Sequence, residues 1–301
     1  MPTEGNGLAD EAGLFELAPA KINLALHVTG QRADGYHLLE SIVTFADTGD
    51  GLSFFAAEED GFTVSGRFAH LLPPDAAGQD GNLVLKARDL LRRMLEKRGI
   101  PTPPVAIHLE KNLPVAAGIG GGSADAAATL RGLLRFWDAG MPEPELASLA
   151  LSLGTDVPMC LRSEALMAKG IGEDLTELAT LPSLPLVLGN PLVGVSTPDI
   201  FRRLMRKDNP PIGALDGDWL PVLKTLRNDL EPPARSLVRE IDQISNLIGA
   251  EGAMLTRMSG SGATCFGIFP SSEAAQKAAE NLNGQKPDWY FQAVQTVGTG
   301  Q

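Results

Sequence analysis

The sequence predicts an α+β protein with two domains. Its 301 residues are enough for one large domain or two ordinary ones, and its 44% hydrophobic and 21% charged residues match an average soluble protein. Strand-like and helix-like segments are mixed without the regular alternation that a doubly wound sheet needs. Because residues 163–182 carry no clear periodicity, we expect a boundary near residue 162, with domains over 1–162 and 163–301.

The first half is expected to be mostly strand before Asn82 and mostly helix after it. The Asn82 side chain suits the N-cap of a helix, and Gly99 suits the position just past its end. Residues 1–13 are polar and expected to be frayed, and 71–81 are expected to form a loop. The expected elements are strands over 14–29, 41–47 and 105–110, short strands around Phe54 and Phe62, and helices over 83–98, about 123–137 and about 143–153.

The second half is expected to combine strands and helices around a second glycine-rich turn. A connector rich in proline and glycine is expected over 209–217. The other expected elements are a strand over 184–190, a helix over 197–207, a helix with apolar residues at Leu237, Ile241, Ile244, Leu247 and Ile248, a strand, glycine loop and strand over 254–269, a helix over 271–282, and a strand over 289–297.

Charge and cysteine content argue against several classes of protein. The net charge of −12 argues against a nucleic-acid partner. Cys160 and Cys265 are isolated and expected to be small buried hydrophobic residues, and the four histidines have no metal-binding spacing. Since no secretory signal and no long apolar run is found, we expect a cytoplasmic protein that does not span a membrane.

The strongest functional signal is PVAAGIGGGSADAAATL at residues 114–130. Its glycines leave backbone N–H groups uncovered, and Ser123 is expected to cap the alanine-rich helix that follows. N–H groups and a helix dipole directed at one point form an anion site, most often for phosphate. The alternative is a flexible loop that only caps the helix. A P-loop requires a lysine, and the dinucleotide fingerprint a third glycine, where Ser123 stands, so neither matches.

Two further segments carry candidate catalytic residues. In LGTDVP at 153–158, Asp156 is either a base for an attacking hydroxyl or an ordinary turn aspartate. In PAKINLALHV at 19–28, Lys21 and Asn23 are two residues apart and share one face of a strand. A charged residue in an apolar strand needs a partner or a ligand, unless Lys21 is exposed on an edge strand.

A second glycine-rich segment is SGSGATCFGIF at residues 259–269. Gly260 and Gly262 flank Ser261 in an expected tight turn between two strands. The turn is either a second cradle of backbone amides or only a hairpin, and the residues alone favour the hairpin.

These four segments, in this order, resemble the GHMP kinase superfamily, which includes galactokinase, homoserine kinase and mevalonate kinase. TGQRADGYHLLES at 29–41, AKGIGE at 168–173 and RNDLEP at 227–232 are similar to one branch, whose substrate is a cytidine diphosphate derivative of methylerythritol in the non-mevalonate isoprenoid route. The resemblance runs from about residue 15 to about 270. It implies a ribosomal-protein-S5-like N-terminal domain, a ferredoxin-like C-terminal domain, and an active site in the cleft between them.

The resemblance implies a kinase that uses ATP and Mg²⁺ to phosphorylate the 2-hydroxyl of that substrate. Asp156 matches the catalytic base of the family, and Lys21 matches the lysine that keeps the base ionised and orients the hydroxyl. The residues that match the ATP site are Asn82, Lys111, Pro114, Gly118, Ile119, Gly120, Gly121, Gly122 and Ser123. No magnesium ligand is assigned, although Ser123 is a candidate.

The resemblance also implies a pocket for the cytosine ring. Tyr36 and His37 match two residues of the aromatic cluster that reads the base, and Phe201 matches a third, with Thr197 nearby. Asn23 is also expected to bind the substrate. We expect small-molecule partners, no nucleic acid, no membrane, and a monomer or weak homodimer.

Two other functions are compatible with parts of this pattern. One is a related kinase for a small hydroxy acid, although such a substrate has no ring for Tyr36 and His37 to stack on. The other is a nucleotide-binding sensor without catalysis, against which the presence of Lys21 and Asp156 argues.

Overall fold

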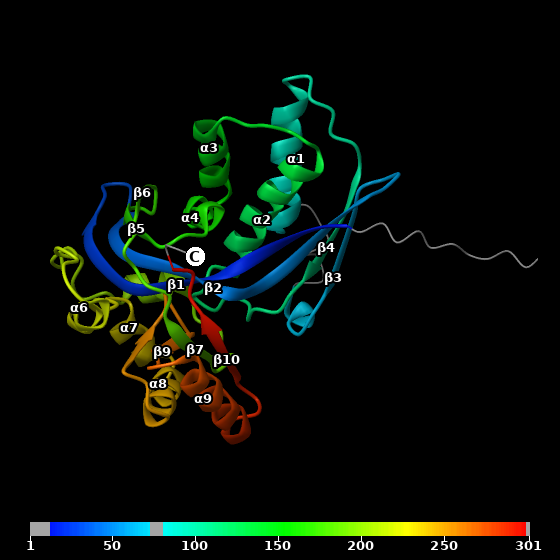
Figure 1. The fold of residues 1–301 in the computed structure, drawn as a ribbon. Coiled ribbons are helices and arrows are strands. Elements are labelled where there is room, and N and C mark those ends of the chain that lie inside the picture. Colours follow the sequence, from blue (N-terminus) through cyan, green and yellow to red (C-terminus); the bar gives the residue numbers. More distant parts are fainter. Residues whose placement is uncertain (1–12, 73–80, 299–301) are drawn as a thin grey trace, which may run out of the picture.

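The protein is represented by a computed structural model, in which residues 13–72 and 81–298 are described. Two β-sheets, each with helices packed on it, lie one above the other in Figure 1. The α+β class is therefore confirmed. The expected frayed segment at residues 1–12, and residues 73–80 of the expected loop, lie outside the described residues.

The first sheet is built on two long antiparallel strands, β1 (Leu14–Gln31) and β2 (His37–Ala56). On its other side, β2 pairs with β4 (Val105–Glu110) at one end and with β5 (Leu166–Gly170) at the other. The sheet is completed by β3 (Gly61–Ser65), parallel to β4, and β6 (Asp174–Glu177), antiparallel to β5.

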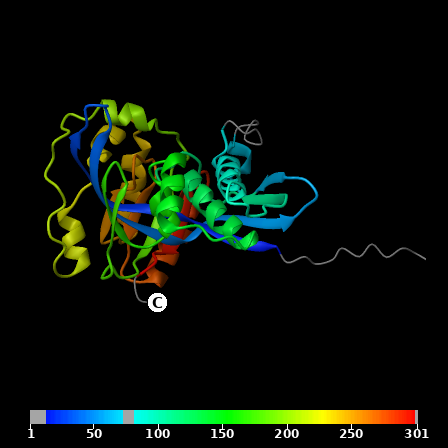
Figure 2. The same cartoon turned by 90° about the horizontal axis from the view of Figure 1, so that it is seen from above.

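Helices cover one face of this sheet, as Figures 1 and 2 show. They are α1 (Leu83–Glu96), α2 (Gly121–Phe136), α3 (Glu143–Leu153) and α4 (Val157–Arg162), and a short 3-10 helix, η1, spans Ala69–Leu71. Asn82 caps α1 as predicted, because its Oδ1 accepts the N–H of Val84 at 2.8 Å.

The second sheet is antiparallel, with the strand order β10-β7-β9-β8. Its strands are β7 (Pro185–Asn190), β8 (Leu255–Met258), β9 (Cys265–Ile268) and β10 (Tyr290–Gln295). The longer helices α8 (Glu240–Ala250) and α9 (Ser272–Gln285) pack against this sheet. The remaining helices are α5 (Thr197–Arg202), α6 (Trp219–Thr225) and α7 (Glu231–Leu237).

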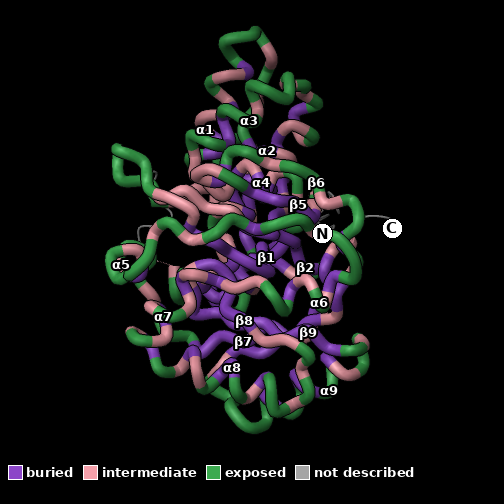
Figure 3. Tube along the Cα trace, turned by 90° about the vertical axis from the view of Figure 1, so that its left-hand side faces the viewer, coloured by how far each residue is buried: buried purple, intermediate pink, exposed green. Residues whose placement is uncertain are grey.

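Strand β1 lies between the two halves of the molecule. Residues 18–28 of β1 are all buried, without the in–out alternation of a strand with one wet face. Ala18 packs in the core under α1–α4, Ile22 in a core shared with the second sheet, and Leu26 in a core shared with α7 and α8. Figure 3 shows β1 and β2 in the buried interior between the two halves. β1 therefore positions the residues that it carries relative to both halves.

Three expectations for the elements after residue 160 need correction. Leu237 does not share a helix with Ile241–Ile248, because Leu237 ends α7, the backbone is extended at Val238, and α8 begins only at Glu240. The helix expected over 197–207 ends at Arg202, because the chain turns away and Asn209 donates its N–H to Val28 O of β1 at 3.0 Å. The stretch 163–182, expected to be irregular, contains β5 and β6, which are too short to show periodicity in sequence. The first sheet thus continues to Glu177, and the boundary near residue 162 stays a prediction.

The cysteines behave as predicted. Cys160 and Cys265 are both buried and unpaired, and burial raises the pKa of both thiols. Among residues 13–72 and 81–298, no helix has both the length and the apolar character needed to span a membrane.

Candidate active site

A cleft of about 1440 Å³ lies where β1, the glycine loop before α2, and segments of the second half meet. The sequence-predicted site residues that line it are Lys21, Asn23, Tyr36, His37, Asn82, Lys111, Pro114, Gly118, Gly120, Gly121, Gly122, Ser123, Asp156, Thr197 and Phe201. Ile119 is the exception, because its side chain is fully buried in the core. The cleft therefore gathers residues that are far apart in the sequence.

Lys21 and Asp156 form an ion pair at one end of the cleft. The Nζ of Lys21 donates to Oδ2 of Asp156 at 2.7 Å, although the two residues are 135 positions apart. Lys21 is 5% exposed, so it is not a lysine exposed on an edge strand. Asp156 precedes α4 but makes no side-chain cap of that helix, and 38% of its side chain is exposed toward solvent. The pair combines a buried cation with an accessible carboxylate.

The glycine loop runs directly beside this pair. Helix α2 begins at Gly121, two residues earlier than predicted, and its N-cap is Gly120 rather than Ser123. Gly120 adopts a φ of +67°, which glycine takes without strain, and a Cβ there would lie 3.1 Å from the Cβ of Lys21. The first turn of α2 carries no acidic residue, so its free N–H groups and dipole offer a site for an anion.

The turn between β8 and β9 packs against the same loop. It is a hairpin, as the residues alone favoured, but it also lines the cleft through Gly260 and Ser261. Gly118 has a φ of +73°, and a Cβ on it would lie 2.6 Å from Ser259 O and 2.7 Å from Gly262 N. The two glycine-rich segments therefore touch backbone to backbone.

Lys111 is engaged with two carboxylates beneath the start of α2. Its buried ammonium donates to Oδ2 of Asp50 and, at 2.7 Å, to Oδ2 of Asp125. Burial and the nearby Asp50 carboxylate raise the pKa of Asp125 to about 7, against the opposing effect of Lys111. Since Lys111 is held in these pairs, its charge chiefly supports the loop, and a Cβ at Gly121 would lie 3.2 Å from its Nζ.

Asn23 connects β1 to β2 and to the β8–β9 turn. Its Nδ2 donates to Ser41 Oγ at 2.8 Å, and its backbone N–H donates to Ser259 Oγ at 3.1 Å. The Oδ1 atom of Asn23 is buried and has no hydrogen-bond partner among the described residues. An acceptor that is left open in this way suits a hydroxyl donor on a ligand.

Aromatic residues form the other end of the cleft. His37 stacks on Phe201 with ring centroids 4.6 Å apart, and Tyr36 beside them is 57% exposed. Burial and the Lys207 cation lower the pKa of His37, which favours the neutral imidazole. Thr197 lies nearby and shares a hydroxyl hydrogen bond of 2.7 Å with Ser261. This end offers ring faces and neutral hydrogen-bonding groups.

Several residues that hold the lining of the cleft in place were not predicted from the sequence. Asp50 and Asp125 hold Lys111, and neither stands in a pattern that separates it from an ordinary surface aspartate. Asn228 holds the turn at Gly260, and its RNDLEP segment was noticed only as part of the resemblance. Contacts between residues that are distant in sequence leave no local signal.

Comparison with known protein families agrees with this geometry. The family described as "GHMP kinases N terminal domain" matches residues 82–164, and "GHMP kinases C terminal" matches residues 205–288. The chain belongs to the GHMP kinase family. A solved homoserine kinase from Cytophaga hutchinsonii shares the fold at a TM-score of 0.69 and 19% identity, covering 99% of this chain and 98% of that one.

Within that family, the similarity to one group is much higher. A 4-diphosphocytidyl-2-C-methyl-D-erythritol kinase from Rhizobium leguminosarum bv. trifolii is 60% identical over 98% of both chains, and one from Agrobacterium fabrum is 59% identical over 94% of this chain and 96% of the relative. A crystal structure of 4-(cytidine 5'-diphospho)-2C-methyl-D-erythritol kinase superposes with a TM-score of 0.78 at 33% identity, covering 94% of this chain and 99% of that one. The chain therefore groups with these kinases.

Proposed function

We propose that the protein transfers the γ-phosphate of ATP to the 2-hydroxyl of 4-diphosphocytidyl-2-C-methyl-D-erythritol. The observation that carries this proposal is the Lys21–Asp156 pair, 2.7 Å apart beside a helix N-terminus, at the opposite end of one cleft from an aromatic cluster. The names of its relatives at about 60% identity point to the same reaction.

Asp156 is proposed to accept the proton of the attacking hydroxyl. Lys21 binds Oδ2 of Asp156, and Oδ1 is the oxygen assigned to take the proton. The hydroxyl oxygen then forms a bond to the γ-phosphorus while the bond to the β,γ-bridging oxygen breaks, and ADP leaves with that electron pair. Lys21 would hold the carboxylate and the hydroxyl in line for this transfer.

The glycine loop is proposed to hold the ATP phosphates. Its N–H groups at the start of α2 face the cleft without an acidic residue in the first turn. Among the described residues, no group of three or more His, Cys, Asp or Glu could hold a resident metal. The site fits a Mg²⁺ that arrives with ATP, which needs only one or two protein oxygens, and Ser123 is the candidate ligand. Such an ion neutralises charge on the phosphates.

The aromatic end is proposed to hold the cytosine. Tyr36 and Phe201 offer ring faces to the pyrimidine, and neutral His37 has a buried Nε2 with no partner in the described part of the chain. A small hydroxy-acid substrate would leave these groups unused. This difference separates the proposed reaction from those of homoserine and mevalonate kinases.

The proposed function extends to the setting in which the protein acts. We propose a cytoplasmic enzyme, since its substrates are small polar molecules. We also propose that it acts as a monomer or weak homodimer. The domain boundary near residue 162 also stays a proposal, and β5 and β6 beyond it still pair within the first sheet.

The proposed reaction is tested by measuring ADP release with Mg-ATP and one of four alcohols. The alcohols are 4-diphosphocytidyl-2-C-methyl-D-erythritol, methylerythritol phosphate, homoserine and mevalonate. We expect turnover with the cytidine compound alone. Turnover with a small alcohol instead would keep the Lys21–Asp156 chemistry but reject the cytosine pocket, and ATP binding without turnover of any alcohol would indicate a nucleotide sensor.

A further inference from the structure

We propose that Asn228 is a positioning residue for this reaction. Its side-chain amide fixes the position of the β8–β9 turn at Gly260 relative to β1. Because Gly260 packs against Gly118, the position of this turn also sets the position of the glycine loop. The inference rests on the proposed function, because it concerns the same cleft. Asn228 belongs to RNDLEP at 227–232, a segment that the proposed chemistry leaves without a role.

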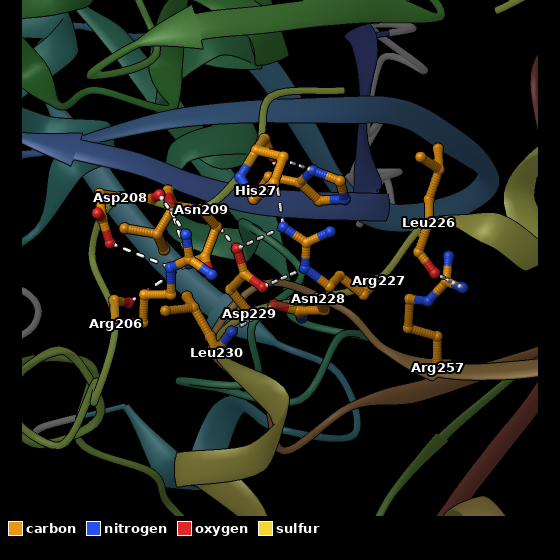
Figure 4. Close-up of polar contacts among 12 residues, drawn as sticks. His27, Arg206, Asp208, Asn209, Leu226, Arg227, Asn228, Asp229, Leu230 and Arg257 are labelled. Atoms are coloured by element: carbon orange, nitrogen blue, oxygen red, sulfur yellow. Dashed lines mark hydrogen bonds and ion pairs between the residues drawn. The ribbon is translucent and has the colours of Figure 1, made fainter. Parts of the chain in front are cut away.

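The backbone on either side of Asn228 is attached to β1. The N–H of Leu26 donates to Arg227 O at 2.9 Å, and the N–H of Asp229 donates to Leu26 O at 2.8 Å. The N–H of Val28 donates to the Asp229 carboxylate at 2.8 Å. Figure 4 shows this segment lying along the strand, with the Arg227–Asp229 ion pair beside it. Asn228 is therefore fixed relative to the strand that carries Lys21.

The side chain of Asn228 reaches the β8–β9 turn. Its Nδ2 donates to Met258 O and to Gly260 O, both at 2.8 Å, and its Oδ1 accepts the N–H of Leu230 at 2.9 Å. The residue is 3% exposed, so water does not replace these bonds. Two carbonyl acceptors and one N–H donor around one buried side chain require an amide.

The turn that Asn228 holds is packed tightly against the backbone of the glycine loop. Ser259 Oγ donates to Gly118 O at 3.1 Å and accepts the N–H of Asn23 at 3.1 Å. Thr264 donates its N–H to Ala117 O at 3.1 Å, and a Cβ on Gly260 would lie 2.6 Å from Gly118 O. A displacement of Gly260 is therefore passed to Gly118.

This chain of contacts predicts which steps depend on Asn228. A misplacement of reacting groups by about 1 Å costs up to about 100-fold in rate. The glycine loop is displaced relative to Lys21 if Gly260 moves. The His37–Phe201 stack is carried by β2 and α5, and α5 meets the turn through the exposed hydroxyl pair of Thr197 and Ser261, which adjusts more easily than the backbone contacts at Gly118. Phosphate transfer and nucleotide binding should weaken, while cytosine binding is kept.

Asn228→Asp tests this role with little change in shape. The substitution keeps the acceptor for Leu230 but replaces the amide donors by a carboxylate oxygen facing two carbonyls. We expect kcat to fall by about 10- to 100-fold. The Kd for ADP should rise by about fivefold or more, and the Kd for CMP should stay within about twofold, since only the first involves the displaced loop.

The matched control is Asn209→Asp. The Asn209 amide donates to Val28 O at 3.1 Å and to Arg206 O at 3.4 Å, so it also attaches the second half to β1 but does not contact the Gly260 turn. We expect wild-type kcat and ADP affinity from this variant. An equal loss in both variants would overturn the proposal, because weakened attachment to β1 would then be the cause.

Wild-type kcat and ADP affinity in Asn228→Asp would also overturn the proposal. If that variant does not fold in circular dichroism melts, Asn228→Ala is measured instead, because it removes the donors without adding a charge, and it carries the same expectations. If wild-type protein does not phosphorylate the cytidine substrate, the proposed function fails, and the ADP and CMP binding constants still decide the role of Asn228.

Discussion

The two ends of the cleft are built on different physical principles. At the phosphate end, Lys21 is 5% exposed and paired, and the glycine loop is held by backbone contacts with the β8–β9 turn. At the aromatic end, Tyr36 is 57% exposed and stands in the β1–β2 connection. A rigid end lowers the cost of aligning reacting atoms, whereas an exposed end with ring faces contributes affinity and adapts to its ligand.

The difference separates chemistry from recognition. Substitutions at the rigid end should change kcat, because the interactions there act on the transferring phosphate. Substitutions at the aromatic end should change KM, because the cytosine ring is bound equally before and during transfer. Substitutions at each end, and at His27 between them, therefore test this division.

The largest effect is expected for Asp156→Asn. Asparagine still accepts a hydrogen bond from Lys21 but cannot take a proton, so kcat should fall by about 100- to 10,000-fold. The measurement is steady-state ADP release, with ADP binding by calorimetry as the check on folding and on the glycine loop. Wild-type turnover in this variant would remove Asp156 as the base.

A smaller effect is expected for Tyr36→Ala. Loss of one stacking face should raise KM for the cytidine substrate by about 5- to 20-fold, toward the weak end of base–aromatic stacking because Tyr36 is exposed. The kcat should stay near that of the wild type. Tyr36→Phe is the matched control, since it keeps the ring, and a fall in kcat rather than a rise in KM would break the division between the two ends.

The smallest effect is expected at His27, on β1 between the two ends. Burial and the Arg227 cation lower the pKa of His27, against the opposing charges of Asp229 and Glu40, and its Nδ1 lies 3.1 Å from Pro210 O. The neutral form is favoured in the folded protein. Its contribution to stability is therefore present above the unfolded pKa of 6.5 and is lost as pH falls through the lowered folded value.

We accordingly expect Tm to fall as pH decreases from 7.5 to 5.5, and to fall less in His27→Gln. The difference between the two proteins should be about 1–3 °C, measured by thermal melts at each pH. Equal pH dependence would mean that His27 is not the responsible group. Because His27 lies outside the cleft lining, kcat at pH 7.5 should be unchanged in this variant.

Local signals allowed much of the fold to be predicted. The Asn82 cap and the helix over 143–153 depend on residues close together in sequence, and both agree with the structure. The start of α2 was misplaced because Ser123 is a strong capping residue, whereas Gly120 reaches the left-handed conformation next to Lys21. The general propensity at Ser123 was overridden by a tertiary contact.

The candidate site depends on contacts that no local pattern contains. Lys21 and Asp156 are 135 positions apart in the sequence, and only the folded chain brings their side chains together. The same holds for Lys111, which only the family resemblance assigned to the ATP site, and whose ammonium is bound by Asp50 and Asp125. Burial of β1 on both faces was also hidden, because the second half that covers it comes much later in the chain.

The length of the β1–β2 hairpin fixes the spacing between the Lys21–Asp156 pair and the aromatic residues. Lys21 and Asn23 lie in the middle of the hairpin, and Tyr36 and His37 lie at its tip. The number of paired residues between Lys21↔Phe45 and Gln31↔His37 therefore sets the distance between the hydroxyl that accepts the phosphate and the pocket for the base. A pair of residues inserted into both strands would lengthen that distance and leave the Lys21–Asp156 chemistry untouched. The length of one hairpin therefore limits how long an alcohol the enzyme accepts, independently of which groups recognise its ends.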